Sequence, residues 1–530
     1  MLTPWWIDEA YLSRRTPLPL YSSTALMFPK FEYSGLDGQL EIAAKIIQAS
    51  LKYYIKIMKN EIPQEKHNDT LLCMNQFKKI FGTTRIPAPR KDQMVYGCDR
   101  DPQCKHIIVL RNGHIFCLPV FDATGKALSI KQLVHELKTQ IVEKSEEYNL
   151  HPIGIVSSDE RGVWADAYIK LKERNGDLVK MVEDSLFAIC LDRKMAHIDG
   201  SSDVDVQAQQ CIHGGGCHNN SSNRWFDKTV QFIVGIDGYC GMTYEHSPSE
   251  GPPAAALMDF IASEIKSDDF DHNDATGSIE PTSPIHFSIP DEKKELILDS
   301  KKNINHIASD TDVKVYTFDH FGKEFIKKLG ISPDSFIQIA MQVAYYRIYG
   351  KLACTSEIAT LRKFTDGRTA IIRLPNFHTA MFTVDITDPD SSEDIPASMM
   401  ATMFRVSAQQ HKKYTLEVMD GKGVDRYLLG LKMIAEEHGH PKPIILDTKA
   451  YQKLMAFTLS TSQIGTHNFI PIAYAPTAPD CYGICYNPQP KKLHFTICTL
   501  NSCMETSSSR FAEELENALV DMRTIILKGE

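Results

Sequence analysis

The chain of 530 residues lacks any apolar run of about 18 residues, so we expect no segment to span a membrane. Its first residues lack the basic and apolar regions of a signal peptide, and its last three form no peroxisomal or endoplasmic-reticulum retention signal. An excess of positive charge is also missing: the net charge of −9 argues against nucleic acid as the main partner. Thirteen scattered cysteines, an odd number, favour reduced thiols in an intracellular protein over a disulfide framework.

Internal repeats and coiled-coil heptads are absent as well, and the length allows two large domains. Residues 266–284 are acidic, polar and interrupted by proline and glycine, a composition typical of a linker or loop. We therefore predict an N-terminal domain over residues 1–283 and a C-terminal domain over residues 284–530, with a long surface loop as the alternative reading. Strand-like runs alternate with helical patterns in both halves, which predicts an α/β or α+β fold.

One histidine stands where a predicted strand ends. Residues 229–234 and 241–246 indicate two strands joined by a turn, and a helix is predicted to follow at 254–261. His246 therefore leaves a rigid element just before a turn, a position from which a side chain can reach a cleft. Imidazole can take and return a proton near neutral pH. Position alone also fits a structural or surface role, which is commoner among the 19 histidines.

The residues around His246 narrow that choice. YEHSPSEGPP at 244–253 and NRWFDK at 223–228 resemble motifs of the carnitine/choline acyltransferase family. Further stretches follow in the family's order and at its approximate spacing: FGKEF (321–325), AYYRIYG (344–350), GRT (367–369), DRYLLG (425–430), LSTSQ (459–463) and GICYN (483–487). The resemblance runs from about Trp5 to the C-terminus and is strongest to the carnitine-using, acetyl-specific branch.

The resemblance implies a fold and a reaction. The fold would be the two-domain α/β type of coenzyme A-dependent acyltransferases, similar to chloramphenicol acetyltransferase, with the active site in a tunnel between domains. The reaction would be reversible transfer of acetyl between coenzyme A and the hydroxyl of carnitine. Coenzyme A would act as a co-substrate, with no permanently bound cofactor. A monomer in mitochondria or peroxisomes, serving fatty acid and lipid metabolism, is also implied.

The resemblance assigns three residues to the chemistry. His246 would be the general acid/base, because acyl transfer from a thioester to a hydroxyl requires a proton acceptor. Ser462 would donate to the tetrahedral oxyanion. Glu250 would organise the site through its charge, or would be a hydrogen-bonded structural carboxylate; both readings stay open.

Three more residues are implied to bind carnitine: Thr369, Arg426 and Ser460. An arginine suits a carboxylate, which carnitine has and choline lacks. A buried arginine would be costly in a choline site because it would have no anionic partner. The alternative for Arg426 is a salt bridge on a helix surface with Asp425 or another nearby acid.

Coenzyme A would bind a local basic site, as the acidic total charge requires. Lys323 and Lys327 stand four residues apart and can share one helical face. They match family lysines at the phosphate end of coenzyme A, and Asp334 and Gln463 match further contacts. For the acyl pocket, Ile472 would fill the space that glycine opens in long-chain enzymes, with Asp259 on the neighbouring helix.

The chain departs from the family pattern at three places. Ser356 replaces a tyrosine that contacts the acceptor carboxylate, and Ala370 replaces an acidic residue after GRT. A helical N-terminal stretch of the family is missing before Trp5. These departures leave two alternatives open: an acyltransferase for choline or another amino alcohol, and a truncated form that binds acyl-CoA without turnover.

A cysteine- and histidine-rich segment lies at 211–218, with Cys211, His213, Cys217 and His218 as possible zinc ligands. It lacks the paired spacing of zinc sites, and the resembling family has His-Gly-Gly-Gly here without relying on metal. We therefore predict no metal.

Overall fold

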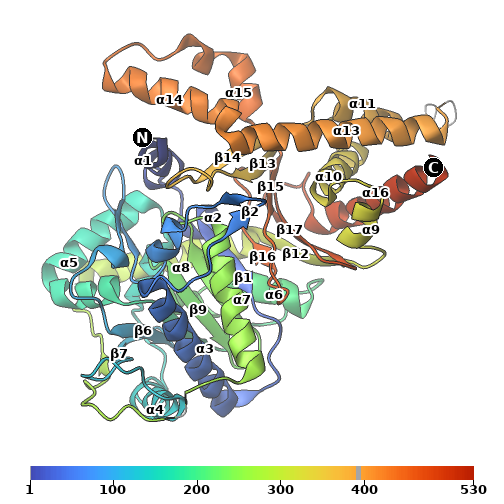
Figure 1. Ribbon diagram of the computed structural model, residues 1–530. Coiled ribbons are helices and arrows are strands. Elements are labelled where there is room, and N and C mark those ends of the chain that lie inside the picture. The colour runs from blue at the N-terminus through green and yellow to red at the C-terminus, as the bar shows by residue number, and fades with distance from the viewer. Residues whose placement is uncertain (1, 272, 290, 389–394, 530) are drawn as a thin grey trace. The chain divides into compact units, whose positions relative to one another are not determined.

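The computed structural model describes residues 2–271, 273–289, 291–388 and 395–529 (Figure 1). The chain forms two compact units. The N-terminal unit contains Ile7–Thr311 and the segment Thr466–Ala475; the C-terminal unit contains Asp312–Gly465, Pro476–Glu530 and Met1–Trp6. Each unit thus holds a short segment whose neighbours in sequence belong to the other unit.

The acidic stretch at 266–284 lies inside the N-terminal unit. Its end forms strand β11 (Ser283–Pro284), which pairs with β7 (His114–Pro119). The units change over between Thr311 and Asp312, not between 283 and 284. Composition identified a segment poor in regular structure, but pairing of its last residues with a strand joins it to the first sheet.

An eight-stranded mixed sheet forms the centre of the N-terminal unit, in the order β11-β7-β6-β8-β9-β10-β1-β16. The two strands predicted before His246 form an antiparallel hairpin of β9 and β10. Every residue of both strands is buried, so both faces of this part of the sheet are covered. The remaining bounds are β1 (Ser23–Met27), β6 (His106–Arg111), β8 (Ala188–Asp192), β9 (Val230–Gly235), β10 (Cys240–Glu245) and β16 (Ile472–Ala473), with small hairpins β2–β3 (Lys66–His67, Thr70–Leu71) and β4–β5 (Thr84–Ile86, Gln93–Val95).

Helices cover this sheet. Helix α3 contacts β8, β9 and α7, and α6 contacts β1 and β10 (Figure 1). The unit's helices are α2 (Leu18–Tyr21), α3 (Gly35–Met58), α4 (Ile130–Glu136), α5 (Arg161–Asp184), α6 (Asp203–His213), α7 (Gly251–Ser267) and α8 (Asp291–Asp310). Helix α7 begins five residues after His246 because Pro252 and Pro253 suit a first turn, whose N–H groups need no partner within the helix.

A six-stranded sheet forms the C-terminal unit, in the order β12-β18-β17-β15-β13-β14. Its strands are β12 (Thr311–Phe318), β13 (Thr355–Thr360), β14 (Thr369–Leu374), β15 (Leu459–Gln463), β17 (Tyr482–Pro488) and β18 (Leu493–Leu500). The helices are α1 (Leu2–Ile7), α9 (Lys323–Lys328), α10 (Pro333–Tyr349), α11 (Phe377–Thr387), α13 (Ala397–Glu417), α14 (Val424–Glu437), α15 (Lys449–Met455) and α16 (Ser508–Gly529). The two mixed sheets agree with the predicted α/β class.

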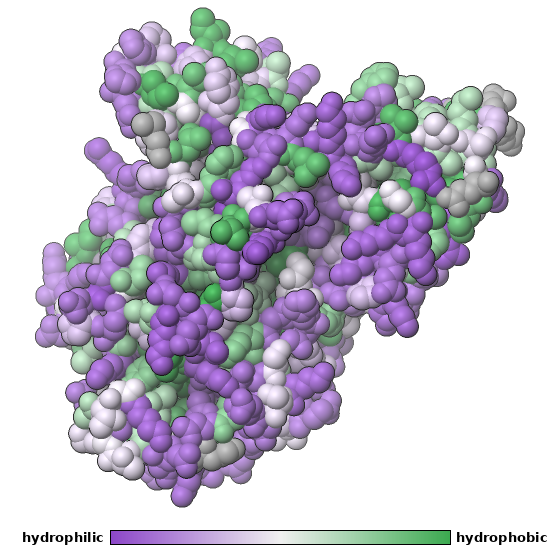
Figure 2. All heavy atoms as spheres, viewed as in Figure 1, coloured by the Kyte–Doolittle hydropathy of each residue, from purple (hydrophilic) through white to green (hydrophobic). Residues whose placement is uncertain are grey.

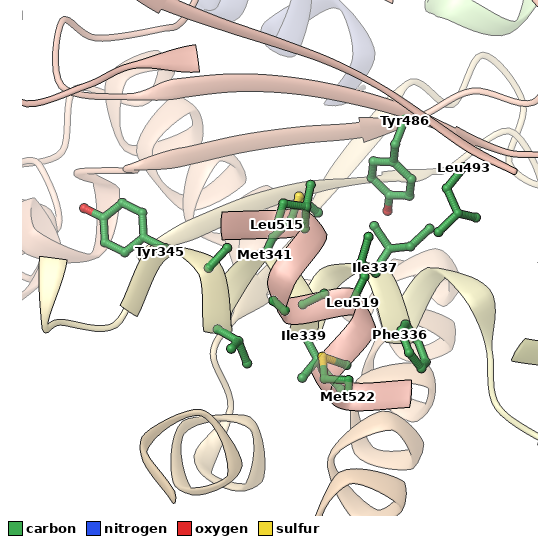
Figure 3. Packing of buried hydrophobic residues seen from close by; sticks show 14 of the residues in the cluster. Phe336, Ile337, Ile339, Met341, Tyr345, Tyr486, Leu493, Leu515, Leu519 and Met522 are labelled. Carbon is green, nitrogen blue, oxygen red and sulfur yellow. The ribbon is translucent and has the colours of Figure 1, made fainter. Parts of the chain in front are cut away.

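The core of the C-terminal unit lies between α10, α16, α13 and one face of the sheet. Figure 3 shows Tyr486 and Leu493 of the strands facing Ile337 of α10 and Leu519 of α16. Helix α10 begins after Ser332, whose hydroxyl accepts from the backbone N–H of Ser335 and caps the helix N-terminus.

The face of the molecule drawn in Figure 2 is mostly hydrophilic, with apolar side chains scattered over it. Exposed isoleucines occur in and after α14, at Ile434, Ile444 and Ile445. Within the described residues, no helix has the length and apolar character needed to cross a bilayer. All thirteen cysteines are free thiols.

Candidate active site

His246 follows the last residue of β10, and its backbone N–H donates to the Ser22 carbonyl oxygen at 3.1 Å. The hydroxyl of Tyr11 lies 3.0 Å from Nδ1 of the imidazole, and the two rings stack with centroids 5.7 Å apart. The side chain of His246 is 22% exposed. A strand end and an aromatic neighbour thus fix the ring while part of it stays accessible.

Glu250 is brought to the same imidazole. Its Oε2 lies 3.6 Å from Nε2 of His246, and its side chain is buried. The backbone N–H of Glu250 donates to Oε1 of Gln76 at 2.8 Å, which holds the turn before α7. A carboxylate at this distance stabilises the imidazolium form of the ring.

A cluster of charged side chains, all buried except the 26% exposed Arg15, lies beside this turn. We call it the arginine cluster, and it comprises Asp92, Arg15, Arg85, Arg161 and Asp227. Asp92 accepts from all three arginines, each at 2.7 Å. Burial opposes ionisation of Asp92, but Arg161 and Arg85 outweigh it and lower the pKa of this carboxyl below its usual value. Asp92 is therefore ionised near neutral pH, whereas burial raises the pKa of the second carboxyl, Asp227, to about 6.

Arg85 of the arginine cluster contacts the side chains of both sequence neighbours of His246, and its Nη1 donates to Oε1 of Glu245 at 3.3 Å. Nη2 of Arg85 donates to the carbonyl oxygen of Tyr11 at 2.7 Å, and Nη1 donates to Oγ of Ser247 at 3.0 Å. Arg85 thus links the short π-helix Asp8–Leu12, which carries Tyr11, to the residue after His246.

The sequence did not identify Tyr11 or the arginine cluster as functional candidates. Tyr11 lies 235 positions before its histidine partner, and no spacing rule connects them. The one available signal was the aromatic run of Trp5, Trp6 and Tyr11 at the start of the family resemblance.

Ile472 lies in the same sheet as the strand before His246. Strand β16 pairs with β1, which pairs with β10, and Ile472 is buried opposite Leu26. Asp259 on α7 accepts from the backbone N–H groups of His467 and Asn468, both at 2.8 Å. Asp259 therefore anchors the loop that leads into β16.

In the C-terminal unit, the predicted acceptor and oxyanion residues share one face of the sheet. Ser356 pairs with Ser460 in register, and β15 places Ser462 two residues further along. Thr369 on β14 belongs to the same face, because Arg373 pairs with Ser356 and side chains alternate along a strand. Four hydroxyl groups are thus presented together on this face.

Arg426 on α14 is buried, not on a helix surface as the alternative reading supposed. Its Nε donates to the carbonyl oxygen of Thr369 at 2.7 Å, and its guanidinium carbon lies 3.4 Å from the centre of the Trp6 ring. The neighbouring Asp425 is bound by Nε of Arg373 at 3.1 Å. Arg426 is therefore fixed against β14.

The predicted coenzyme A residues occupy two elements and a strand end. Lys323 and Lys327 are the first and fifth residues of α9. Asp334 lies in the first turn of α10 and accepts from the Tyr486 hydroxyl at 2.6 Å. Gln463 ends β15 and is exposed.

The cysteine- and histidine-rich segment has a structural role. His213 is buried at the end of α6, where its Nδ1 accepts from the backbone N–H of Gly215 at 3.0 Å. Burial lowers the pKa of His213 to about 3. Gly214 has φ of +79° and ends the helix in the left-handed conformation. Within the part of the chain that the structure describes, three possible metal ligands converge elsewhere, at Asp334, Glu357 and His411.

Over almost its whole length, the chain is similar in sequence to known acetyltransferases. Carnitine O-acetyltransferase of Columba livia is 39% identical over 99% of this chain and 83% of its own length, and that of Homo sapiens is 38% identical over the same shares. Choline O-acetyltransferase of Rattus norvegicus is 33% identical over 99% of this chain and 82% of its own length.

The chain also matches a sequence profile of a whole protein family. Residues 1–517 fit the profile described as choline/carnitine O-acyltransferase. This confirms the resemblance on which the sequence analysis relied, and with it the assignment of the chain as an acyltransferase. The chain belongs to the choline/carnitine O-acyltransferase family.

Proposed function

We propose that this protein is a carnitine O-acetyltransferase, which moves acetyl reversibly between coenzyme A and the hydroxyl of carnitine. The observation that carries the proposal is His246 at a strand end, with Tyr11 at one ring nitrogen and Glu250 near the other. The 38–39% identity to carnitine O-acetyltransferases supports the choice of reaction.

The imidazole suits direct transfer between the two substrates. With the proton on Nδ1, donated to the Tyr11 oxygen at 3.0 Å, Nε2 has the free lone pair that a general base needs. Nε2 takes the proton of the carnitine hydroxyl, and the oxygen attacks the thioester carbonyl. When the C–S bond breaks, Nε2 returns the proton to the sulfur of coenzyme A. Glu250 stabilises the imidazolium formed between these steps.

Ser462 is the proposed donor to the oxyanion of the tetrahedral intermediate. Ser460, Thr369 and Arg426 are proposed to bind carnitine. Their support is that Ser460 and Thr369 share one sheet face with Ser462, and that Arg426 contacts the backbone of Thr369. The fixed positive charge of an arginine suits the carnitine carboxylate.

Lys323, Lys327, Asp334 and Gln463 are proposed to bind coenzyme A, which is a co-substrate, with no permanently bound cofactor. The lysine pair on α9 supplies local positive charge for phosphate groups in an acidic protein. A monomer in mitochondria or peroxisomes, as for the family, is part of the proposal.

Ile472 is proposed to restrict the acyl group to acetyl or another short chain. It is buried and branched, so added methylenes would meet a filled space. Asp259 supports this restriction by holding the loop that precedes Ile472.

Choline is the second candidate acceptor. Ser356, buried beside Ser460, is too short for the carboxylate contact that the family's tyrosine makes. The test is release of free thiol from acetyl-CoA with L-carnitine or choline as acceptor. The proposal predicts turnover with carnitine, and preferential turnover with choline would refute it in favour of the second candidate.

A further inference from the structure

Strand β15 presents its residues to two different environments. Ser460 and Ser462 lie on one face of the sheet, while Thr461 between them is buried on the face covered by helices. Because side chains alternate along a strand, whatever fixes Thr461 also fixes the direction of the two serines. The contacts of Thr461 therefore bear on the groups proposed to meet the substrate.

A chain of hydrogen bonds starts at Thr461. Nε2 of Gln338 on α10 donates to Oγ1 of Thr461 and lies equally close to the Tyr486 hydroxyl, at 2.9 Å each. The Tyr486 hydroxyl in turn donates to Oδ1 of Asp334 at 2.6 Å. Figure 3 shows the hydroxyl of Tyr486 directed from the sheet toward the helices. Thr461 is thus connected to the N-terminal turn of α10.

The chain ends in a group that we call the acid cluster, which comprises Asp334, Glu357, His411 and Tyr486. Nε2 of His411 on α13 lies 2.8 Å from Oε2 of Glu357, and Nδ1 lies 2.8 Å from Oγ of Ser335. Ligand-type atoms of Asp334, Glu357 and His411 all lie within 4.8 Å of one another. Glu357 pairs with Thr461 in register on β13, so the cluster lies directly beside β15.

The acid cluster has more acidic groups than basic ones to compensate them. Burial and the neighbouring Asp334 carboxylate raise the pKa of Glu357 to about 8. Burial alone would lower the pKa of His411, but the Glu357 carboxyl outweighs it and raises it. Burial and Asp334 also raise the pKa of Tyr486. Near neutral pH Glu357 therefore keeps its proton, which it shares with the Asp334 carboxylate.

We propose that Glu357 and His411 are positioning residues for acyl transfer, acting through Asp334, Tyr486, Gln338 and Thr461 to align Ser460 and Ser462. This inference rests on the proposed function, since it concerns the same serines. Loss of the shared proton leaves an uncompensated negative charge beside Asp334 and rearranges the hydrogen bonds. Activity should therefore fall as the pH rises through the range in which Glu357 ionises.

Tyr486→Phe tests the connection, because it removes one hydroxyl and no charge. The matched control is Tyr349→Phe, whose hydroxyl bonds to Tyr482 and to the carbonyl oxygen of Glu505, in the same unit but outside the acid cluster. We expect Tyr486→Phe to lower kcat about tenfold, because the free energy of one hydrogen bond corresponds to about that factor in rate. The control should leave kcat unchanged. Equal kcat for both variants, each shown to be folded, would overturn the proposal.

Glu357→Gln tests the role of the shared proton through the pH profile of kcat, which a change in fold stability alone would not shift. The wild type should lose kcat above about pH 8, and this alkaline limb should shift to higher pH in the variant. The same limb in both proteins would overturn the proposal while leaving acyl transfer intact. Absence of wild-type turnover with either acceptor refutes the proposed function and this inference together.

Discussion

Each unit has a cluster of charged side chains close to its predicted catalytic residues, and the two clusters differ in the balance of acidic and basic groups. In the N-terminal unit, the arginine cluster surrounds Asp92 with three guanidinium groups and contacts the Ser247 side chain next to His246. In the C-terminal unit, the acid cluster combines two carboxyls and a phenol with a single imidazole. The arginine cluster has more guanidinium groups than carboxyls, whereas the acid cluster has more acidic groups than basic ones.

This difference gives the two clusters different responses to protons. Arginine cannot lose its proton in a protein, and Arg161 and Arg85 lower the pKa of Asp92, so the contacts around Asp92 keep one charge state over the range in which enzymes work. The second carboxyl of the arginine cluster, Asp227, differs, because burial raises its pKa to about 6. The acid cluster contains a carboxyl that titrates near pH 8. The charges that contact the residues next to His246 therefore stay constant near neutral and alkaline pH, whereas the region proposed to hold the oxyanion donor is sensitive to alkaline pH.

The largest expected effect is on the arginine cluster. Asp92→Ala leaves three arginines without their common acceptor, and removing one partner of a buried ion pair costs about 3–5 kcal/mol of unfolding free energy. Urea unfolding at neutral pH measures it. Asp37→Ala is the control, since Asp37 is exposed and pairs only at the surface with Lys138. Equal midpoints for the two variants would contradict this account of the cluster.

The next effect separates the clusters by the sign of their pH dependence. The folded pKa of Asp92 lies below its unfolded value, so its stabilising contribution is present above the unfolded pKa and is lost on acidification. The folded pKa of Glu357, about 8, lies above the ordinary 4.5, so its contribution is present below 4.5 and is lost as pH rises through 8.

Glu357→Gln should therefore flatten the decline in unfolding free energy between about pH 5 and 8, by at most about 1.4 kcal/mol per pH unit. Urea midpoints over this range measure the slope. The control, Glu41→Gln, changes an exposed partner of Lys45 and should keep the wild-type slope. An unchanged slope in Glu357→Gln would show that the two clusters do not differ as described.

The smallest effect concerns the link between the arginine cluster and the base. Tyr11→Phe removes the hydroxyl at Nδ1 of His246 but leaves the backbone contact with Arg85. Loss of one hydrogen bond should lower kcat about tenfold. Tyr239→Phe, which loses an exposed bond to Asp203, should keep wild-type kcat. A wild-type kcat in Tyr11→Phe would mean that the ring is oriented without this bond.

The site residues predicted from the sequence lie close to one another within local segments of the chain. His246 and Glu250 stand four residues apart after a recognisable strand, and Ser460 and Ser462 alternate along another. The strand end at His246 was visible from local patterns, whereas the family resemblance implied the roles of Glu250, Ser460 and Ser462, and the α/β class followed from alternating elements.

Both buried clusters escaped prediction because their members come from distant elements. Asp92 meets Arg161 across 69 positions, and His411 meets Glu357 across 54, so no periodicity connects them. The division of the chain was also missed, because a return of residues 466–475 to the first sheet leaves no compositional mark. Such contacts depend on tertiary packing.

The central claim is tested most directly by carnitine-dependent release of thiol from acetyl-CoA by the wild type and by His246→Ala. The account predicts turnover in the wild type and a loss of about 10²–10⁴-fold in the variant, the range for a general acid/base. Undiminished turnover in a folded His246→Ala protein would contradict the assignment of His246 as the base.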